Sequence, residues 1–567
     1  MNHSHRIYRA TCIMLAWALQ GILSMSCVTA ADIQEQVKAF LKEHEETIRP
    51  LEIAANRAWW DANVSGKDED FAAKEQAQNK LDAALADPAR FARLKSLRDA
   101  KTQDTTLARV VDVLYLVYLE KQVPPELLQR ISSKANSIEK KFNVFRAPVG
   151  DEQLTDSEVR KVLTKSKDSA QRQKVWEASK KVGADVETEL KELVLLRNEA
   201  ARKLGFPNYH AMQLHVTEHR PEVVLEIFDK LDKLTREPFA KAKAEIDQAL
   251  AKSYGLKVED LRPWHYHDPF FQQPPDIGAT SLDAPFVKAN IEAICSKFYT
   301  GIGLPIDDVL ARSDLYEKPG KSPHAFCTDI DRQGDVRVLA NIVPNEYWMA
   351  TMLHELGHAV YSSKNIPASV PYAVRTESHI LATEGVAMMF ERFAGSSAWL
   401  QSMGLKVEDP AAYDRAARTA RRYKLLIFSR WCQVMLRFEQ GMYANPDQDL
   451  NKLWWDLVEN YQMLRRPEGR NAPDYGSKIH IVSAPCYYHN YMLGELFACQ
   501  LHQALAREVL KADDPIAAIY HDDPRVGKFM QEKVFGPGRL LSWNELTKHA
   551  TGSPLTPDSF AREFATK

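Results

Sequence analysis

The feature that most constrains this chain is the segment His354-Glu355-Leu-Gly-His358, an HExxH sequence. Two histidines four residues apart project from one face of a helix, with the glutamate beside them, as a zinc-water hydrolase requires. The apolar residues on both sides predict a buried helix with Asn345 as its N-cap. The alternative interpretation is a chance match on a partly exposed helix, since five-residue motifs have false positives. The rest of the chain must decide between the two.

Charge and cysteine content narrow the class of protein. The chain has 74 Lys and Arg against 76 Asp and Glu, so its net charge of −2 predicts no attraction of the whole molecule to nucleic acid or an anionic membrane. Beyond residue 30 the cysteines are Cys295, Cys327, Cys432, Cys486 and Cys499. This odd, widely spaced set does not indicate a disulfide framework; one bridge is possible, and at least one thiol stays free.

Residues 1–30 have the organisation of a secretory signal peptide. Two arginines precede an apolar run that ends at Cys27, and small residues follow it. An uncleaved membrane anchor is the alternative, although the run is short for a span and interrupted by polar residues. Cys27 raises the question of lipidation, but the preceding Ser24-Met-Ser lacks the aliphatic residue of a lipobox. We expect a secreted or periplasmic protein with no stable membrane span after cleavage.

Helical periodicity dominates residues 32–201, where apolar residues recur every three or four positions and strand signals are absent. The predicted helices there are Ile33–Ile48, Phe71–Leu85, Pro88–Asp99, Leu107–Leu119, Pro125–Phe142, Asp156–Lys181 and Asp185–Leu204. Another block covers Pro221–Tyr254 and a further helix lies near Val287–Gly301. Just before the Pro221 block are His215, Glu218 and His219, which we expect to cap the turn rather than bind metal.

Two other segments break the helical pattern. Residues 261–285 form a loop dense in aromatics and prolines, and long loops of this kind are often functional. Strands are predicted over 324–330 and 336–342, joined by a turn, and this hairpin leads directly into the HExxH helix. No linker divides the chain. We predict a single catalytic domain over 31–567, mainly α, with a helical N-terminal half (about 31–300) and a zinc-bearing half (about 301–567).

A catalytic zinc ion takes three protein ligands and leaves one position for water, so a third donor is needed downstream of the HExxH helix. The next helical stretch, 375–392, carries Glu377, Glu384 and Glu391, whose spacing of seven predicts one helix face. Glu377 lies 19 residues past His358, a spacing that fits a thermolysin-like arrangement. Glu384 lies 26 residues past His358, which fits the gluzincins with a longer loop. Spacing alone therefore does not choose.

The surroundings of the two glutamates favour one of them. Small residues beside Glu384 allow a close approach to another helix, whereas Glu377 stands near the expected helix start, where carboxylates are common for capping. We predict Glu384 as the ligand and Glu377 as a structural or neighbouring group. His379 is expected to be packed or hydrogen-bonded rather than a ligand.

Three spaced segments resemble the angiotensin-converting-enzyme family of zinc dipeptidyl carboxypeptidases. Thr383-Glu384-Gly-Val-Ala-Met388 stands where the family has His-Glu-Ala-Ile-Gly-Asp, whose Glu is the third ligand. His324-Ala325 begins 30 residues before His354, as the family's His-Ala-Ser-Ala strand does. Residues 478–491 are similar to Lys-Phe-His-Ile-Pro followed by Pro-Tyr-x-x-Tyr, with one residue inserted. Direct resemblance covers about 320–510; the N-terminal half agrees only in helical character.

The resemblance implies a role for each matched residue. His354, His358 and Glu384 would bind one Zn²⁺ ion, and Glu355 would act as general base and then pass the proton to the leaving amine. His480 and Tyr491 would donate hydrogen bonds to the developing oxyanion. Lys478 and Tyr488 would bind the C-terminal carboxylate of the substrate. His324 and the Ala325 backbone would pair with its extended chain as an added strand.

This sequence also departs from the family pattern. The family Asp that orients a zinc histidine is Met388 here, so that contact must come from elsewhere. The Arg that binds an activating chloride corresponds to Asn490, which puts chloride dependence in question, and a cysteine pair around the hairpin is missing because Pro323 precedes His324. The family's carboxylate-binding Gln corresponds to Tyr266 or His267, which leaves dipeptide release open.

Taken together, these features predict a large helical ellipsoid with a deep central groove and a small antiparallel sheet next to the zinc-binding helix. The expected activity is zinc-dependent hydrolysis of oligopeptides with release of C-terminal dipeptides. A general oligopeptidase or a single-residue carboxypeptidase of a related helical zincin family is the alternative. A non-catalytic peptide-binding protein is a more remote one, since a decayed site usually loses a ligand or the base first. The oligomeric state and the physiological peptide do not follow from the sequence.

Overall fold

The computed structural model describes residues 30–564 with the exception of 279. The predicted signal peptide, with Cys12 and Cys27, lies outside these residues. Across the described part of the chain, no helix has both the length and the apolar character that a membrane span needs. The five described cysteines are all free thiols, so no disulfide bridge joins any pair of them.

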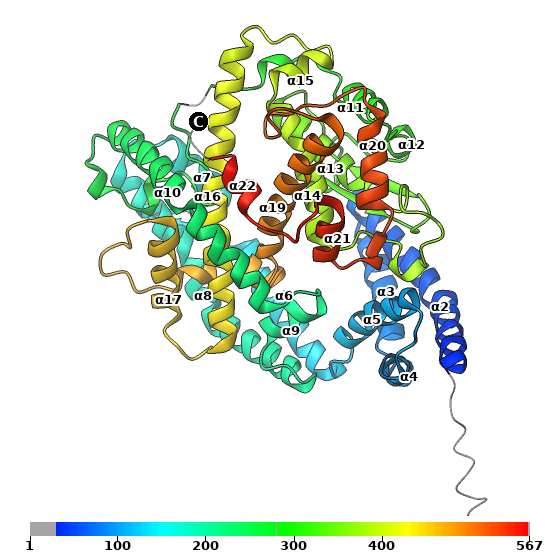
Figure 1. The fold of residues 1–567 in the computed structure, drawn as a ribbon. Coiled ribbons are helices and arrows are strands. Elements are labelled where there is room, and N and C mark those ends of the chain that lie inside the picture. Colours follow the sequence, from blue (N-terminus) through cyan, green and yellow to red (C-terminus); the bar gives the residue numbers. More distant parts are fainter. Residues whose placement is uncertain (1–29, 279, 565–567) are drawn as a thin grey trace, which may run out of the picture.

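The fold is mainly α, as predicted (Figure 1). In the described residues the strands form two antiparallel pairs: β1 (Ala147–Val149) with β2 (Glu152–Leu154), and β3 (Phe326–Asp329) with β4 (Val336–Leu339). The second pair is the hairpin that the sequence predicts before the HExxH helix. The first pair was not predicted, because strands of three residues are too short to show a period of two.

The N-terminal helices are α2 (Ala30–Ser65), α3 (Asp68–Leu85), α4 (Pro88–Ala100), α5 (Thr105–Glu120), α6 (Pro125–Val144), α7 (Asp156–Lys165), α8 (Ser169–Lys203), α9 (Tyr209–Val216), α10 (Pro221–Tyr254), α11 (Ile291–Gly301) and α12 (Asp307–Leu310). The remaining helices are α13 (Glu346–Val360), α14 (Ile380–Glu391), α15 (Ser397–Ser402), α16 (Pro410–Ala444), α17 (Leu450–Leu457), α18 (His480–Ser483), α19 (Tyr488–Leu505), α20 (Pro524–Met530), α21 (Trp543–Thr551) and α22 (Asp558–Arg562).

Several predicted helix boundaries are wrong. Helix α2 continues past Ile48 through Pro50 to residue 65, because its buried face continues through Trp60 and Ala62. The predicted interruption near 182–184 is also absent from α8: Gly183 stays helical and lies against the carbonyl oxygen of Pro473, where a Cβ atom would come within 2.2 Å. The true boundary comes earlier, where the Asp168 side chain caps the start of α8.

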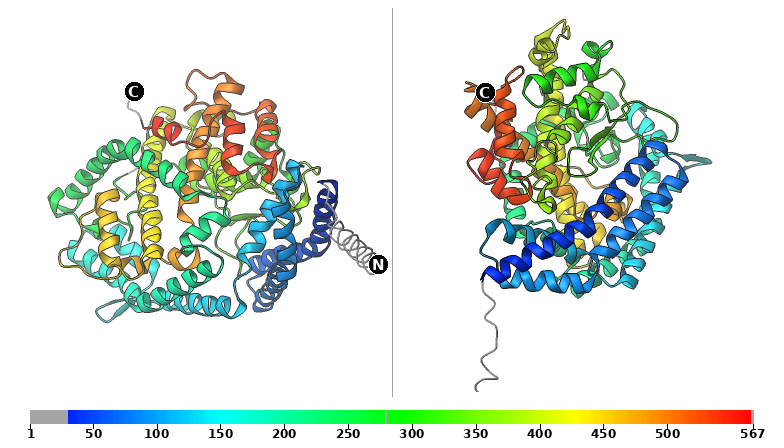
Figure 2. Two further views of the ribbon diagram at one scale, coloured as in Figure 1. Left: turned by 60° about the horizontal axis from the view of Figure 1, so that its bottom comes forward. Right: turned by 90° about the vertical axis from the view of Figure 1, so that its right-hand side faces the viewer.

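A hydrophobic core extends through both halves of the chain. One continuous cluster of buried side chains includes residues from Val37 to Phe560. In Figure 1, α16 stands as a long yellow helix that packs against α19, and α14 packs against both α19 and α13. The right-hand view of Figure 2 shows α2 lying diagonally across the outside of the molecule. The HExxH helix is thus held inside the fold, among helices that come from distant parts of the sequence.

Three glycines let the central helices approach closely. A Cβ atom at Gly357 of α13 would lie 2.7 Å from the Cα atom of Ala387 in α14. At Gly385 of α14 it would lie 2.8 Å from the carbonyl oxygen of Gly494 in α19, and at Gly494 it would lie 3.1 Å from the Cβ atom of Glu384. The small residues that the sequence places beside Glu384 therefore fix how near α14 lies to both of its neighbours.

Candidate metal centre

Helix α13 presents the two histidines of the HExxH segment. It begins at Glu346, and the Asn345 side chain accepts a hydrogen bond from the Trp348 N–H at 2.9 Å, which confirms the predicted N-cap. His354 and His358 are four residues apart and share one face of the helix. Their side chains keep 18% and 17% of their surface exposed, so both can be reached from outside the core.

Helix α14 supplies the carboxylate of the site. The residue at which this helix begins shows which of the three glutamates lie on it. The His379 side chain accepts a hydrogen bond from the Leu381 N–H and so caps the helix, while its Nε2 atom contacts the Thr217 carbonyl oxygen at 2.9 Å. The helix proper begins at residue 380. Glu377 lies before it, so the prediction that Glu377, Glu384 and Glu391 share one helix face is wrong for Glu377. His379 is a capping residue, consistent with its expected structural role.

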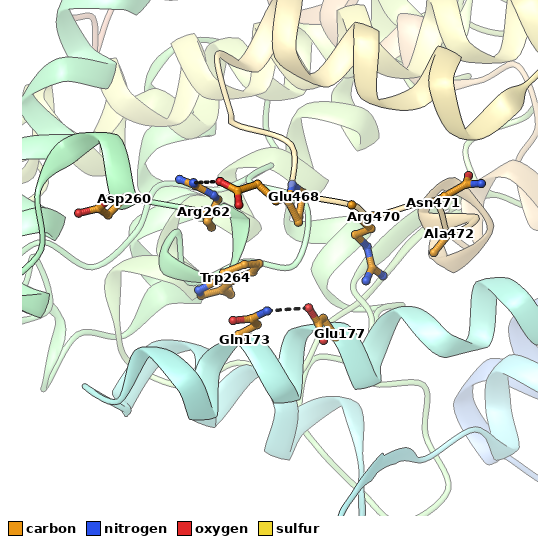
Figure 3. Close-up of a pocket in the computed structure, with 11 residues that line it drawn as sticks. Gln173, Glu177, Asp260, Arg262, Trp264, Glu468, Arg470, Asn471 and Ala472 are labelled. Atoms are coloured by element: carbon orange, nitrogen blue, oxygen red, sulfur yellow. Dashed lines mark hydrogen bonds and ion pairs between the residues drawn. The ribbon is translucent and has the colours of Figure 1, made fainter.

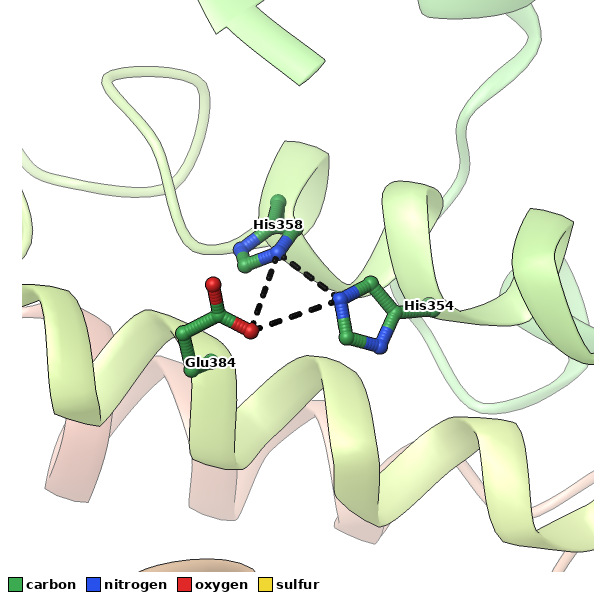
Figure 4. Close-up of side chains that lie close together, drawn as sticks. All are labelled: His354, His358 and Glu384. Carbon is green, nitrogen blue, oxygen red and sulfur yellow. Dashed lines mark hydrogen bonds and ion pairs between the residues drawn. The ribbon is translucent and has the colours of Figure 1, made fainter. Parts of the chain in front are cut away.

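Side chains of His354, His358 and Glu384 converge at one point (Figure 4). The Oε2 atom of Glu384 lies 3.5 Å from Nε2 of His354 and 3.9 Å from Nε2 of His358, and the two Nε2 atoms are 3.1 Å apart. In the described part of the chain, no other three His, Cys, Asp or Glu side chains gather in this way. The three residues come from neighbouring helices that the glycine contacts hold together.

These donors fit a zinc ion. Two imidazole nitrogens with one carboxylate oxygen form a typical catalytic zinc set. The other nitrogen of each ring is already engaged: Nδ1 of His354 lies 2.7 Å from Oε2 of Glu391, and Nδ1 of His358 lies 2.7 Å from Oγ1 of Thr383. Each ring is therefore held with its Nε2 atom toward the shared point, as a metal ligand requires. Glu391, one turn beyond Met388, supplies the contact that the family Asp would make.

Glu355 is the buried acid of the site. Only 8% of its surface is exposed, and burial raises its pKa to about 7, although a positive charge on His354 would lower it. A backbone hydrogen bond from Cys327 of β3 reaches this carboxylate. The hairpin edge and the HExxH helix therefore meet at Glu355, and a pKa near 7 suits a group that must both take up and release a proton.

His480 and Tyr491 lie on a third segment, at α18 and the start of α19. The His480 ring centroid is 5.2 Å from that of Tyr488, which is 5.6 Å from that of Tyr491. Burial and the nearby Lys478 charge lower the pKa of His480 to about 4, whereas burial and the Glu384 charge raise the pKa of Tyr491. Near neutral pH both side chains carry a proton that can be donated: a neutral imidazole N–H and a phenol O–H.

Lys478 and Tyr488 meet a glutamine that the sequence comparison missed. Nζ of Lys478 donates to Oε1 of Gln272 at 2.8 Å, and the Tyr488 hydroxyl lies 3.5 Å from the same oxygen. Gln272 belongs to the aromatic loop over residues 261–285, and the buried Asp268 side chain holds its backbone N–H. The loop was expected to be functional, but the family's glutamine was matched to Tyr266 or His267, which lie a few residues before Gln272.

Tyr266 and His267 are engaged elsewhere. The Tyr266 hydroxyl donates to Asp247 at 2.7 Å and accepts from Lys243, while Nε2 of His267 is 2.9 Å from the Tyr254 hydroxyl. The structure therefore places Gln272, and neither of these two residues, against Lys478. The correspondence expected from the sequence does not match this geometry.

Asn490, at the position of the family's chloride-binding Arg, lies in a neutral cluster. Its Oδ1 atom is 2.8 Å from Nε2 of His219, whose ring contacts those of His379 and His489 at 4.6 and 4.9 Å between centroids. Burial lowers the pKa of His219 to about 4. Glu218, just before it, pairs with Arg539 and with Arg109. Among the described residues none of these groups belongs to a metal-binding set.

His324 and Ala325 directly precede β3. His324 is exposed and Ala325 is half-buried. Strand β3 pairs with β4 on one side only, and Cys327 directs its N–H away from β4 toward Glu355.

A separate pocket of about 600 Å³ opens beside α8 (Figure 3). Arg262 and Trp264 of the loop 261–285 line it, but none of the metal-binding, catalytic or carboxylate-binding candidates does. Arg262 pairs with Glu468 at 3.3 Å, and Gln173 donates to Glu177 at 2.9 Å. The converging chemistry of this chain therefore lies at α13 and α14 and not at this surface pocket.

Comparison with known proteins agrees with this arrangement. The chain matches the sequence model of the family described as angiotensin-converting enzyme over residues 31–261 and 269–557; the interval between them holds most of the divergent aromatic motif. It is also similar to the angiotensin-converting enzyme of Theromyzon tessulatum, with 21% identity over 308 residues. That alignment covers 51% of this chain and 49% of the other protein, so the chain matches about half of that relative's length. By its family match over nearly the whole sequence, the chain belongs to the angiotensin-converting-enzyme family of peptidases.

Proposed function

We propose that this protein is a zinc-dependent peptidase that shortens oligopeptides from the C-terminus, releasing dipeptides. The observation that carries the proposal is the convergence of His354, His358 and Glu384 on one point, with Glu355 on the same helix. A zinc ion held there would supply a Lewis acid and lower the pKa of its bound water to about 7. The other groups around the site divide the remaining work of peptide hydrolysis.

Proton transfer falls to Glu355. With a pKa raised to about 7, its carboxylate can accept a proton from the attacking water and its acid form can return that proton to the leaving amine. The backbone hydrogen bond from Cys327 fixes the direction of the carboxylate. A base with an ordinary carboxyl pKa would be poorer at the second of these steps.

His480 and Tyr491 would stabilise the negative charge that develops on the scissile carbonyl oxygen. Both are neutral donors near pH 7, and donors held in place in this way stabilise an oxyanion as its charge develops. The charge of Glu384 acts on the Tyr491 hydroxyl, which is consistent with a position close to the metal centre.

Lys478, Tyr488 and Gln272 would bind the C-terminal carboxylate of the substrate. An ammonium, a phenol and an amide beside one another offer the charge and the donors that a carboxylate needs. The Lys478 charge also lies over the Tyr488 ring, 5.3 Å from its centroid, which holds it in place. This cluster is the reason to expect release of short C-terminal pieces rather than cleavage at any bond.

The free edge of β3 would hold the extended substrate backbone. His324 is exposed, Ala325 directly precedes β3, and the Cys327 N–H of this strand reaches Glu355, so a peptide that adds as a further strand here would lie next to Glu355. A strand-like substrate places its scissile bond beside the base. Folded proteins seldom present a long extended segment of this kind and would be poor substrates.

The test is product analysis combined with metal analysis. The purified protein is incubated with an N-terminally blocked pentapeptide, and products are identified by mass spectrometry while zinc is counted per chain. We expect one zinc ion and a released C-terminal dipeptide. A released single residue would assign a carboxypeptidase, internal fragments an oligopeptidase, and zinc-free protein without turnover a peptide-binding protein.

A further inference from the structure

The two zinc-site histidines are held by unlike groups. Nδ1 of His354 faces a carboxylate oxygen of Glu391, whereas Nδ1 of His358 faces the hydroxyl of Thr383, each at 2.7 Å. A carboxylate that accepts the Nδ1–H proton fixes the ring tautomer and makes the Nε2 atom a stronger donor; a neutral hydroxyl fixes direction with less effect on donor strength. Of the two groups that hold the histidine rings, only Glu391 therefore carries a negative charge.

Glu391 reaches His354 from an unexpected position on α14. Counting from Glu384, the next residue on the same face is Met388, which offers no acceptor, and Glu391 follows one turn later. The side chain of Glu391 is only 20% exposed, and its second oxygen lies 3.3 Å from Nζ of Lys424 on α16. One carboxylate thus joins a ring on α13 to an ammonium on α16.

We propose that Glu391, oriented by Lys424, is the positioning residue that determines how tightly His354 and the other two donors hold zinc. Glu391 does not touch the metal or the substrate; it acts through the His354 ring. The proposal rests on the zinc centre of the proposed function. It adds that zinc retention depends on the carboxylate at 391, which does the work of the missing family acid at 388.

The experiment measures zinc affinity by competition with a chromogenic chelator, using the full-length protein and its variants. Glu391→Gln keeps the shape of the side chain and removes its charge, and we expect zinc to bind about 10- to 100-fold more weakly. The matched control is Glu237→Gln, which neutralises a glutamate paired with Lys241 at 2.9 Å on the exposed face of α10. The control should bind zinc like the unmodified protein.

Two further readouts separate positioning from folding. The thermal midpoint of zinc-free protein should be nearly equal for the Glu391→Gln variant and the unmodified chain, while the rise in midpoint on adding zinc should be smaller for the variant. The double variant M388D/E391Q returns a carboxylate to the same helix face and should recover at least threefold in zinc affinity. Lys424→Met should weaken zinc less than Glu391→Gln does, because it only releases the carboxylate.

Three results would overturn the proposal. One is zinc affinity of Glu391→Gln within twofold of the unmodified protein. Another is a zinc-free midpoint that drops as far as the zinc-bound one, since the role is then structural. If the unmodified protein binds no zinc, the proposed function fails together with this inference; if it binds zinc and cleaves peptides while Glu391→Gln binds equally well, only the inference fails.

Discussion

At the scale of single residues, the site separates into groups that bind, groups that transfer protons and groups that orient. His354, His358 and Glu384 meet at one point, and Glu355 lies beside them with a pKa raised by burial. The buried carboxylate is the group whose removal should affect chemistry and leave structure intact. Orientation comes from Glu391 and Thr383, which have no place in the HExxH motif itself.

Replacing the base gives the sharpest residue-scale prediction. Glu355→Gln should lower kcat by about 10²- to 10⁴-fold, the usual contribution of a general acid-base group, because the amide cannot accept the proton from water. Zinc content and thermal midpoint should be unchanged. The measurement is turnover of a quenched fluorescent peptide alongside metal analysis. A variant with full activity would show that another residue is the base.

Lys478 should make recognition of the substrate terminus depend on pH. Burial lowers the pKa of Lys478 to about 8, so its ammonium form, which binds a carboxylate, is lost as the pH rises through this value. KM for a free-acid peptide should therefore increase above about pH 8. The same peptide with an amidated C-terminus should be cleaved poorly at every pH and show no such increase. Equal KM profiles for the two peptides would contradict the assigned role.

Lys478→Met provides the matching substitution. A hydrogen bond to a charged group is worth about 1.5–3 kcal/mol, so kcat/KM for free-acid peptides should fall by roughly 10- to 100-fold. Cleavage of the amidated peptide should change little, because it offers no carboxylate. If both substrates lost activity equally, Lys478 would support the fold rather than recognise the terminus.

Chloride is expected to have little effect on activity. Asn490 replaces the Arg that the family uses for this ion, and its partner His219 is neutral at physiological pH because burial lowers its pKa to about 4. Activity in sodium chloride and in sodium gluconate at equal ionic strength should agree within about twofold, since screening is then the same. A strong, saturable activation by chloride alone would point to an anion site elsewhere.

At the scale of elements, the site depends on how closely three helices pack. Gly357 faces Ala387 between α13 and α14, and Gly385 faces Gly494 between α14 and α19. These contacts set the separation between the helix that carries the histidines and the helix that carries Glu384. A change in helix spacing would therefore move the third donor away from the first two.

Gly357→Ala should test this spacing. The added Cβ atom would lie 2.7 Å from a backbone atom of Ala387, so α14 must shift, and overpacking of this kind costs about 1–3 kcal/mol. Zinc affinity should fall together with stability, although alanine favours helix more than glycine does. Gly395→Ala is the control, because a Cβ atom at this position would lie 3.4 Å from the Cβ atom of Ala417, an ordinary van der Waals contact. Unchanged zinc affinity in Gly357→Ala would show that the helices can adjust.

Helices and the hairpin were largely predictable from the sequence, since apolar periodicity and caps such as Asn345 are local signals. The errors in helix boundaries come from contacts between distant parts of the chain. Helix α2 continues beyond Ile48 because its buried face continues, and Gly183 stays helical with the backbone of Pro473 packed against it. The HExxH motif indicated His354 and His358, and the small residues beside Glu384 favoured this glutamate as the third donor. Gln272 and Glu391 could be found only in the structure. No local sequence pattern places loop 261–285 next to Lys478, and none indicates that residue 391 rather than residue 388 contacts His354.

At the scale of the whole molecule, a buried carboxyl group outside the metal-ligand set makes stability depend on pH. Glu439 of α16 is 1% exposed, and its carboxylate accepts a hydrogen bond from the Cys486 N–H at 2.8 Å. Burial raises its pKa to about 8. A carboxyl group whose pKa is higher in the folded than in the unfolded state stabilises the fold at low pH, and this contribution is lost as the pH rises toward the folded pKa.

Glu439→Gln should therefore flatten the pH profile of unfolding. Between about pH 5 and pH 8 the folded protein binds up to one proton more at this site than the unfolded chain, so the free energy of unfolding falls by up to roughly 1.4 kcal/mol per pH unit. The amide of the variant cannot titrate, so the variant should lack this slope. Urea unfolding at pH 5.5 and 7.5, compared between the two proteins, gives the difference. If the free energy of unfolding fell equally with pH in both proteins, the pH dependence would come from groups other than Glu439.

The contact between Gln272 and Lys478 has a consequence for substrate binding. Before any peptide binds, the amide oxygen of Gln272 already accepts a hydrogen bond from the Lys478 ammonium and lies near the Tyr488 hydroxyl. The ammonium has further N–H bonds, so an incoming carboxylate can bind beside the amide without displacing it. The long lysine side chain is thus already ordered when the peptide binds, and less conformational entropy is lost in the process.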